Sequence, residues 1–179
     1  MSSLANNEKS NRKVILISND LKKVTILQEI AKLSVLINSM LENDDEDEDD
    51  YSENNIPKIE LANVTYDVLL KVIEFITYHY ENGPMEEIEK PLKSPKLEEI
   101  VSEWDASFVS LDNEKLFEII LAANYLDIQS LLDLTCAKVA TIIKGKSPEE
   151  IRKTFNITND FTPEEEAQVR EENKWANHD

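Results

Sequence analysis

The sequence has 179 residues and a formal net charge of −18, because 37 acidic residues stand against 19 lysines and arginines. The length suits one compact domain with tails, and so acidic a chain repels nucleic-acid phosphates and anionic membrane lipids. Only two glycines, Gly83 and Gly145, are present, which excludes a glycine-rich phosphate-binding loop. We therefore expect proteins as partners, with no direct binding to nucleic acid or membrane.

The N-terminal part of the chain predicts a small sheet followed by a helix. Residues 1–12 lack any apolar period and predict a disordered tail. Residues 14–18 (VILIS) and 24–27 (VTIL) are rich in β-branched side chains, which predicts two strands of a hairpin. From Gln28 onward the period changes to three and four, which predicts a single helix of about four turns. Its apolar stripe is Ile30, Leu33, Ile37 and Leu41.

An acidic segment then interrupts the apolar pattern. Residues 42–53 hold nine carboxylates in twelve positions, so we expect a disordered loop over residues 42–57. Residues 58–62 (KIELA) alternate and predict a third strand. Thr65 opens a second helix, which Gly83 and Pro84 end. Residues 83–103 contain three prolines among charged residues, and we interpret them as a linker that splits the chain into two halves.

The second half predicts only helices. Residues 104–108, 113–125 and 128–144 form three helical segments, and Gly145 is a C-terminal cap. Two further helices begin with the same signature, SPEE at 147–150 and TPEE at 162–165. In each, a hydroxyl caps the helix, proline takes the first position and glutamate the third. We expect a domain over residues 13–145 and a helical extension over residues 146–179.

Catalytic and metal-binding patterns are missing from the sequence. The only cysteine, Cys136, cannot form an internal disulfide, and the two histidines, His79 and His178, are far apart. A zinc site lacks ligands, and no nucleophile has a well-placed base. We therefore expect a protein that is not an enzyme and that needs neither metal nor cofactor.

Apolar residues in the last third are too sparse to form a core among themselves. One interpretation is that they fold back onto the domain, and the other is that they bind an apolar segment of a partner. The set consists of Ile151, Phe155, Ile157, Phe161, Val169 and Trp175.

The segment from Trp104 onward, which contains FEIILAANYLDIQSLLDLTCAKVATIIKGKSPEEIRKTFNITNDF, closely resembles the S-phase-kinase-associated (Skp) adaptors of SCF (Skp, cullin, F-box) ubiquitin ligases. The first half matches more loosely, through its strands, the EIAKLSVLINSML helix and the VLLKVIEFITYHY helix. The resemblance covers about residues 13 to 175, and the linker departs from the family pattern. It implies a BTB/POZ-type α/β (α+β) fold with a C-terminal helical extension.

The resemblance also implies a function. In this family the BTB part docks a cullin and the extension wraps F-box substrate receptors, so the protein is a non-catalytic adaptor, cytoplasmic and nuclear. On this basis Asn124 and Tyr125 are predicted cullin contacts, although Tyr125 could instead bury its ring against the next helix. The predicted F-box contacts are Leu132, Cys136, Val139, Ile143, Ile151, Phe155, Ile157, Phe161, Val169 and Trp175. Two alternatives stay open. One is an F-box-binding scaffold in a non-ligase complex such as a kinetochore assembly, and the other is a self-associating BTB module that uses its β-rich face for a weak homodimer when unpartnered.

Overall fold

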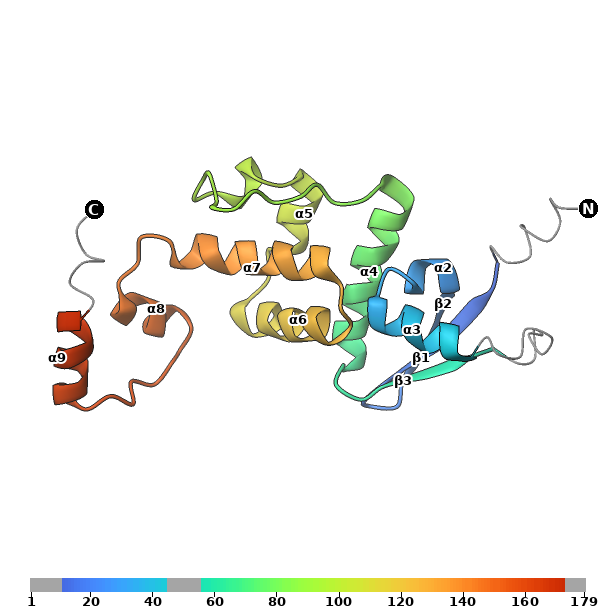
Figure 1. Ribbon diagram of the computed structural model, residues 1–179, viewed down its shortest axis with the longest axis horizontal. Coiled ribbons are helices and arrows are strands. Elements are labelled where there is room, and N and C mark those ends of the chain that lie inside the picture. The colour runs from blue at the N-terminus through green and yellow to red at the C-terminus, as the bar shows by residue number, and fades with distance from the viewer. Residues whose placement is uncertain (1–10, 45–55, 173–179) are drawn as a thin grey trace, which may run out of the picture. The chain divides into compact units, whose positions relative to one another are not determined.

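The computed structural model describes residues 11–44 and 56–172, which form the elements of Figure 1. Three strands, β1 (Lys13–Ser18), β2 (Lys23–Leu27) and β3 (Lys58–Leu61), form one sheet in the order β2-β1-β3. The β1–β2 pair is antiparallel, as the predicted hairpin requires, and β3 joins β1 in parallel. Parallel pairing needs a crossover connection, and the helices after β2 provide it.

The helix predicted from Gln28 is not continuous. The structure has a short helix, α2 (Gln28–Ala31), and then α3 (Val35–Asp44). The cause is Ser34, whose buried Oγ donates a hydrogen bond to the carbonyl of Leu126 at 2.5 Å and accepts one from the N–H of Ile37 at 3.2 Å. A contact with a residue 92 positions away thus restarts the helix. Leu33 is consequently 44% exposed and lies outside the core stripe.

The larger helices follow the predicted segments closely. They are α4 (Tyr66–Asn82), α5 (Glu103–Phe108), α6 (Asn113–Tyr125) and α7 (Gln129–Ile143). Helix α4 contacts the sheet through β1 on one side and α6 on the other, so it links the two groups of elements seen in Figure 1. The mixed α/β architecture is as expected.

The segment between α4 and α5 does not divide the chain into halves, and the linker interpretation is wrong in this respect. Ile88 and Leu97 are 6% and 2% exposed, and they belong to the same apolar cluster as the sheet and α4. Leu97 also begins a short 3-10 helix, η2 (Leu97–Glu99). This segment therefore packs, through the apolar residues between its prolines, against the same core as the sheet and α4.

The chain forms two compact units, one ending at Ile142 and one beginning at Ile143. In the second unit, Ser147 and Glu150 form the predicted capping box of α8 (Pro148–Thr154). At the start of α9 (Pro163–Glu172), the N–H of Thr162 donates to Glu165 at 2.8 Å. This bond and the Thr162 hydroxyl lower the pKa of Glu165. Both predicted helix starts are confirmed.

The remaining boundary predictions have mixed outcomes. Gly145 follows α7 with φ of 76°, a left-handed conformation that suits the predicted cap. The first residues of the acidic run, up to Asp44, are the last turn of α3 rather than loop. The rest of that run, the tail before residue 11 and the residues after 172 lie outside the described residues.

Candidate functional site

The end of α6 carries the two residues predicted to contact a cullin. Asp112 caps the helix by accepting the N–H of Lys115 at 2.9 Å, and the last helical residue is Tyr125. Asn124 is exposed, whereas Tyr125 is half-buried and packs partly against the core. The Tyr125 side chain thus packs partly inward and is partly exposed to solvent, and its role as a cullin contact stays a prediction.

The turn after α6 is held by the start of α3. Ser34 binds the Leu126 carbonyl, and the N–H of Val35 donates to the carbonyl of Asp127 at 3.3 Å. Asp127 has φ of 52°, a left-handed conformation that aspartate tolerates. These bonds hold the corner beside Asn124 in one conformation.

Three exposed apolar side chains near this corner were missed by the sequence analysis. Phe117 and Leu121 are 40% and 69% exposed, and with Asn124 they follow the spacing of one helix face. Val35, beside the corner, is 57% exposed. The sequence does contain an indication of these exposed residues, since α6 has apolar residues on more than one face. All of them were interpreted as core because the segment was expected to be a core helix.

Helix α7 brings the first four predicted F-box contacts onto one face. Leu132, Cys136, Val139 and Ile143 are separated by four, three and four residues and so align along the helix. The opposite face is the core face. It contains Leu131, Leu134 and Ala137, all buried.

The four residues of this face, here called the α7 stripe, are only partly covered. Leu132 and Val139 pack partly against the core, and Ile143 is half-buried. Cys136 is exposed. An apolar stripe of this kind, left open on a helix whose core face is complete, is typical of a surface that a partner covers.

The second unit holds the remaining predicted F-box contacts. Ile151 and Phe155, one turn apart at α8, are half-buried. Ile157, Phe161 and Val169 are 54%, 46% and 40% exposed. They have therefore not folded away into a core. Trp175 lies outside the described residues.

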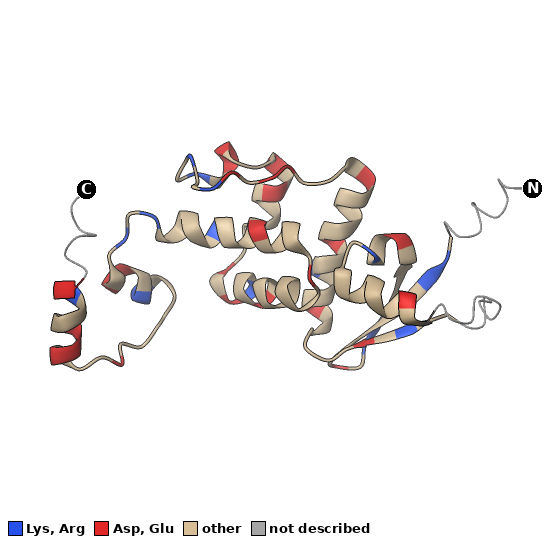
Figure 2. Ribbon diagram, in the orientation of Figure 1, with Lys and Arg blue, Asp and Glu red and all other residues tan. Residues whose placement is uncertain are grey.

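Arg152 organises this second unit. Its guanidinium pairs with Glu166 of α9 at 3.2 Å and lies over the ring of Phe161 at 5.8 Å. A second pair, Arg170 with Glu149 at 2.8 Å, also joins α9 to α8. Acidic and basic residues occur on both helices (Figure 2), and these two ion pairs join α8 to α9 while Ile157, Phe161 and Val169 stay exposed.

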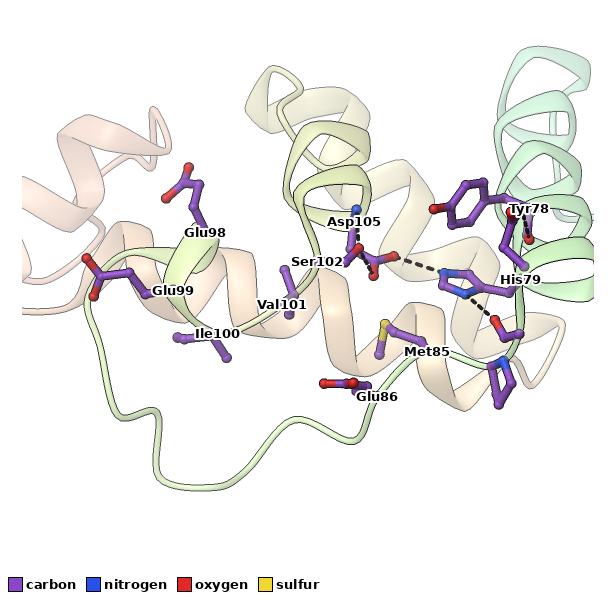
Figure 3. Close-up of a pocket in the computed structure, with 13 residues that line it drawn as sticks. Tyr78, His79, Met85, Glu86, Glu98, Glu99, Ile100, Val101, Ser102 and Asp105 are labelled. Carbon is purple, nitrogen blue, oxygen red and sulfur yellow. Dashed lines mark hydrogen bonds and ion pairs between the residues drawn. The ribbon is translucent and has the colours of Figure 1, made fainter.

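A separate hollow lies where α4 ends, and Figure 3 shows its lining. At its wall, His79 Nε2 is 2.9 Å from an Asp105 carboxylate oxygen, and Nδ1 is 3.1 Å from the Gly83 carbonyl. Asp105 also accepts the Ser102 hydroxyl at 2.7 Å. Nε2 thus ties the end of α4 to α5, and Nδ1 bonds to the carbonyl of the residue that ends α4 itself. Both ring nitrogens are engaged in structural bonds rather than placed as a catalytic base.

Metal binding and membrane insertion find no support in the described ranges. Between residues 11 and 44 and between 56 and 172, no three His, Cys, Asp or Glu side chains gather as metal ligands would. None of the helices in these same ranges combines the length and hydropathy that a bilayer crossing requires.

Comparisons with known proteins agree on one family. Residues 12–81 match the model described as "Skp1 family, tetramerisation domain", and residues 129–176 match "Skp1 family, dimerisation domain". The S-phase kinase-associated protein 1 homolog of Tetrahymena thermophila is 55% identical, over 94% of this chain and 96% of that protein. The E3 ubiquitin ligase complex SCF subunit sconC of Arthroderma benhamiae is 49% identical, over 93% of this chain and 96% of that protein. The suppressor of kinetochore protein 1 of Schizosaccharomyces pombe is 50% identical, over 92% of this chain and 97% of that protein.

The two family models cover the sheet with α4 and α7 with its extension, and the relatives align over more than 90% of the chain. The model that matches residues 12–81 is that of the Skp1 POZ domain, which agrees with the BTB/POZ-type fold expected from the sequence. The chain belongs to the Skp1 family.

Proposed function

We propose that this chain is the non-catalytic adaptor of an SCF ubiquitin ligase, joining a cullin to F-box substrate receptors. The observation that carries the proposal is the existence of two separate open surfaces: the α6 face with Asn124 and the α7 stripe. No residue of either surface belongs to the fully buried core, although Leu132 and Val139 pack partly against it. An adaptor needs two such surfaces and no catalytic group.

The cullin side of the proposal is tested by introducing positive charges on α6. Because Tyr125 packs partly on the core, the sharper variant is Leu121→Lys with Asn124→Lys, both at exposed positions. Two added positive charges and a lost apolar contact should abolish binding of a purified cullin N-terminal domain. Binding of a recombinant F-box domain should be unchanged, and loss of both would indicate misfolding.

The F-box side is tested by the reciprocal change. Leu132→Asp with Val139→Asp places two carboxylates on the α7 stripe, and deletion of residues 161–179 removes Phe161, Val169 and Trp175. Each should abolish F-box binding and leave cullin binding intact. Persistence of F-box binding in either variant would contradict the proposal.

The kinetochore alternative is not favoured, because fungal relatives are named as SCF subunits. Recovery of F-box proteins without any cullin would reverse this preference. We further propose that the adaptor is cytoplasmic and nuclear, which a fluorescent fusion would test.

We also propose weak self-association of the unpartnered chain. Its support is the exposure of Ile157, Phe161 and Val169, which lose contact with water if two copies associate. Sedimentation at several concentrations, with and without an F-box domain, should show dimers only in its absence.

A further inference from the structure

The segment that follows α4 is held in place beside α7. Residues 85–93, here called the strap, follow α4, and Ile88 within them is only 6% exposed. Met85 and Leu92 pack partly against the core on either side of it. The strap therefore has a defined position on the first unit and presents fixed side chains to its surroundings.

The strap is joined to α7 by one ion pair. Lys90 Nζ donates to an Asp133 carboxylate oxygen at 3.0 Å, and Gln129 Nε2 donates to the same oxygen at 3.1 Å. The Asp133 side chain is 26% exposed, whereas that of Lys90 is 70% exposed. The hydrogen bond from Lys90 to Asp133 and the negative charge of Asp133 raise the pKa of Lys90. A carboxylate that α7 holds in place thus positions a cation that is largely open to solvent.

This cation lies at the edge of the α7 stripe. Asp133 directly follows Leu132 and precedes Cys136 by three residues, so at about 100° per residue it borders the stripe. Strap and helix together line a hollow formed by Glu87, Ile88, Glu89, Lys90 and Asp133.

We propose that the strap is one wall of the F-box-binding groove and that Lys90 is a specificity-determining contact within it. The occupant is the F-box helix that covers the α7 stripe, and it presents a carboxylate to the Lys90 ammonium. The inference rests on the proposed function and is supported by continuity, since the pair with Asp133 lies directly beside Leu132. An ammonium has three N–H donors, and the bond to Asp133 uses one. Because Asp133 already orders Lys90, a partner binding it loses less conformational entropy.

The test compares two lysines of the strap. Lys93 is equally exposed, at 74%, but its ammonium pairs with Glu89 of the strap itself rather than with α7. Lys90→Met and Lys93→Met keep the length of the side chain and remove the charge. Affinity for a recombinant F-box domain is measured by calorimetry, and denaturation checks that both variants fold like the parent.

Lys90→Met should weaken F-box binding roughly fivefold, as the loss of an exposed charge pair does, while Lys93→Met should leave it unchanged. The difference should vanish in 1 M salt, where charges are screened beyond about 3 Å. Asp133→Asn should weaken binding less than Lys90→Met, because it releases Lys90 without removing it.

The outcomes separate this inference from the proposed function. If Leu132→Asp with Val139→Asp leaves F-box binding intact, the proposed groove itself is wrong. If that variant abolishes binding but Lys90→Met binds like Lys93→Met, only the role of the strap is overturned. Tighter binding by Lys90→Met would also overturn it, because the partner would then present a basic group to Asp133.

Discussion

Replacing Ser34 with alanine should destabilise the first unit by about 2–3 kcal/mol. The hydroxyl accepts the N–H of Ile37 at 3.2 Å and so caps α3, and loss of a cap costs about 1 kcal/mol. It also donates to the carbonyl of Leu126 at 2.5 Å in a fully buried site. Leaving that carbonyl without its partner costs roughly 1–2 kcal/mol more. The Leu126 carbonyl also accepts a longer hydrogen bond from the N–H of Leu36, at 3.4 Å. This remaining bond limits the loss of unfolding free energy.

Urea denaturation monitored by tryptophan fluorescence measures this effect. The chain has two tryptophans, so a Trp175→Phe background leaves Trp104 as the reporter. Trp104 stacks on Tyr78 with ring centroids 3.7 Å apart and therefore reports on the first unit. With a slope near 2 kcal/mol per M, the midpoint should fall by about 1 M.

Asp112→Ala is the matched control for this prediction. Asp112 caps α6 through the N–H of Lys115 at an exposed site and makes no buried bond to another segment. It should lower stability by only about 1 kcal/mol. If Ser34→Ala costs no more than Asp112→Ala, the bond to Leu126 contributes nothing and the reasoning fails.

Three further substitutions test a left-handed backbone conformation, a carboxylate with a lowered pKa and a helix cap. Leu21 has φ of 61° and is 79% exposed, so Leu21→Gly should raise the unfolding free energy by roughly 0.5–1 kcal/mol in urea titrations, since it removes left-handed strain. Hydrogen bonds from Ser18 and Lys22 lower the pKa of Asp20 from 3.8 to about 2. Its ionised form therefore stabilises the fold above pH 3.8, and this contribution is lost as the pH falls towards 2. Asp20→Asn should flatten the pH dependence of thermal unfolding in that window. Ser147→Ala should reduce the helical circular dichroism signal of the second unit and leave the Trp104 transition unchanged.

Local sequence signals predicted those elements whose causes are local. The capping residues Ser147 and Thr162 lie within three positions of the groups they bind, so their helices could be located from sequence alone. The face that carries Leu132 and Cys136 follows from helical periodicity in the same way.

The failures share a different cause, which is contact between distant segments. The break before α3 depends on a Leu126 carbonyl that a local reading of residues 28–41 cannot include. Proline and charge made residues 83–103 look like a linker, yet Ile88 and Leu97 are buried in a core formed by the rest of the unit. The missed exposure of Leu121 has another cause: α6 carries apolar residues on more than one face, but an apolar residue on a helix is interpreted as core by default.

One turn connects the two proposed binding surfaces. Asn124 ends the surface on α6, Leu132 begins the α7 stripe, and the residues between them include Leu126 and Asp127, whose carbonyls are held by α3. A protein without catalytic groups can influence ubiquitin transfer only by fixing the position of one partner relative to the other. The bonds from Ser34 and Val35 hold the Leu126 and Asp127 carbonyls on the shortest path along the chain between the two surfaces. We therefore expect the break in the predicted helix to be the place where the position of one surface relative to the other is fixed.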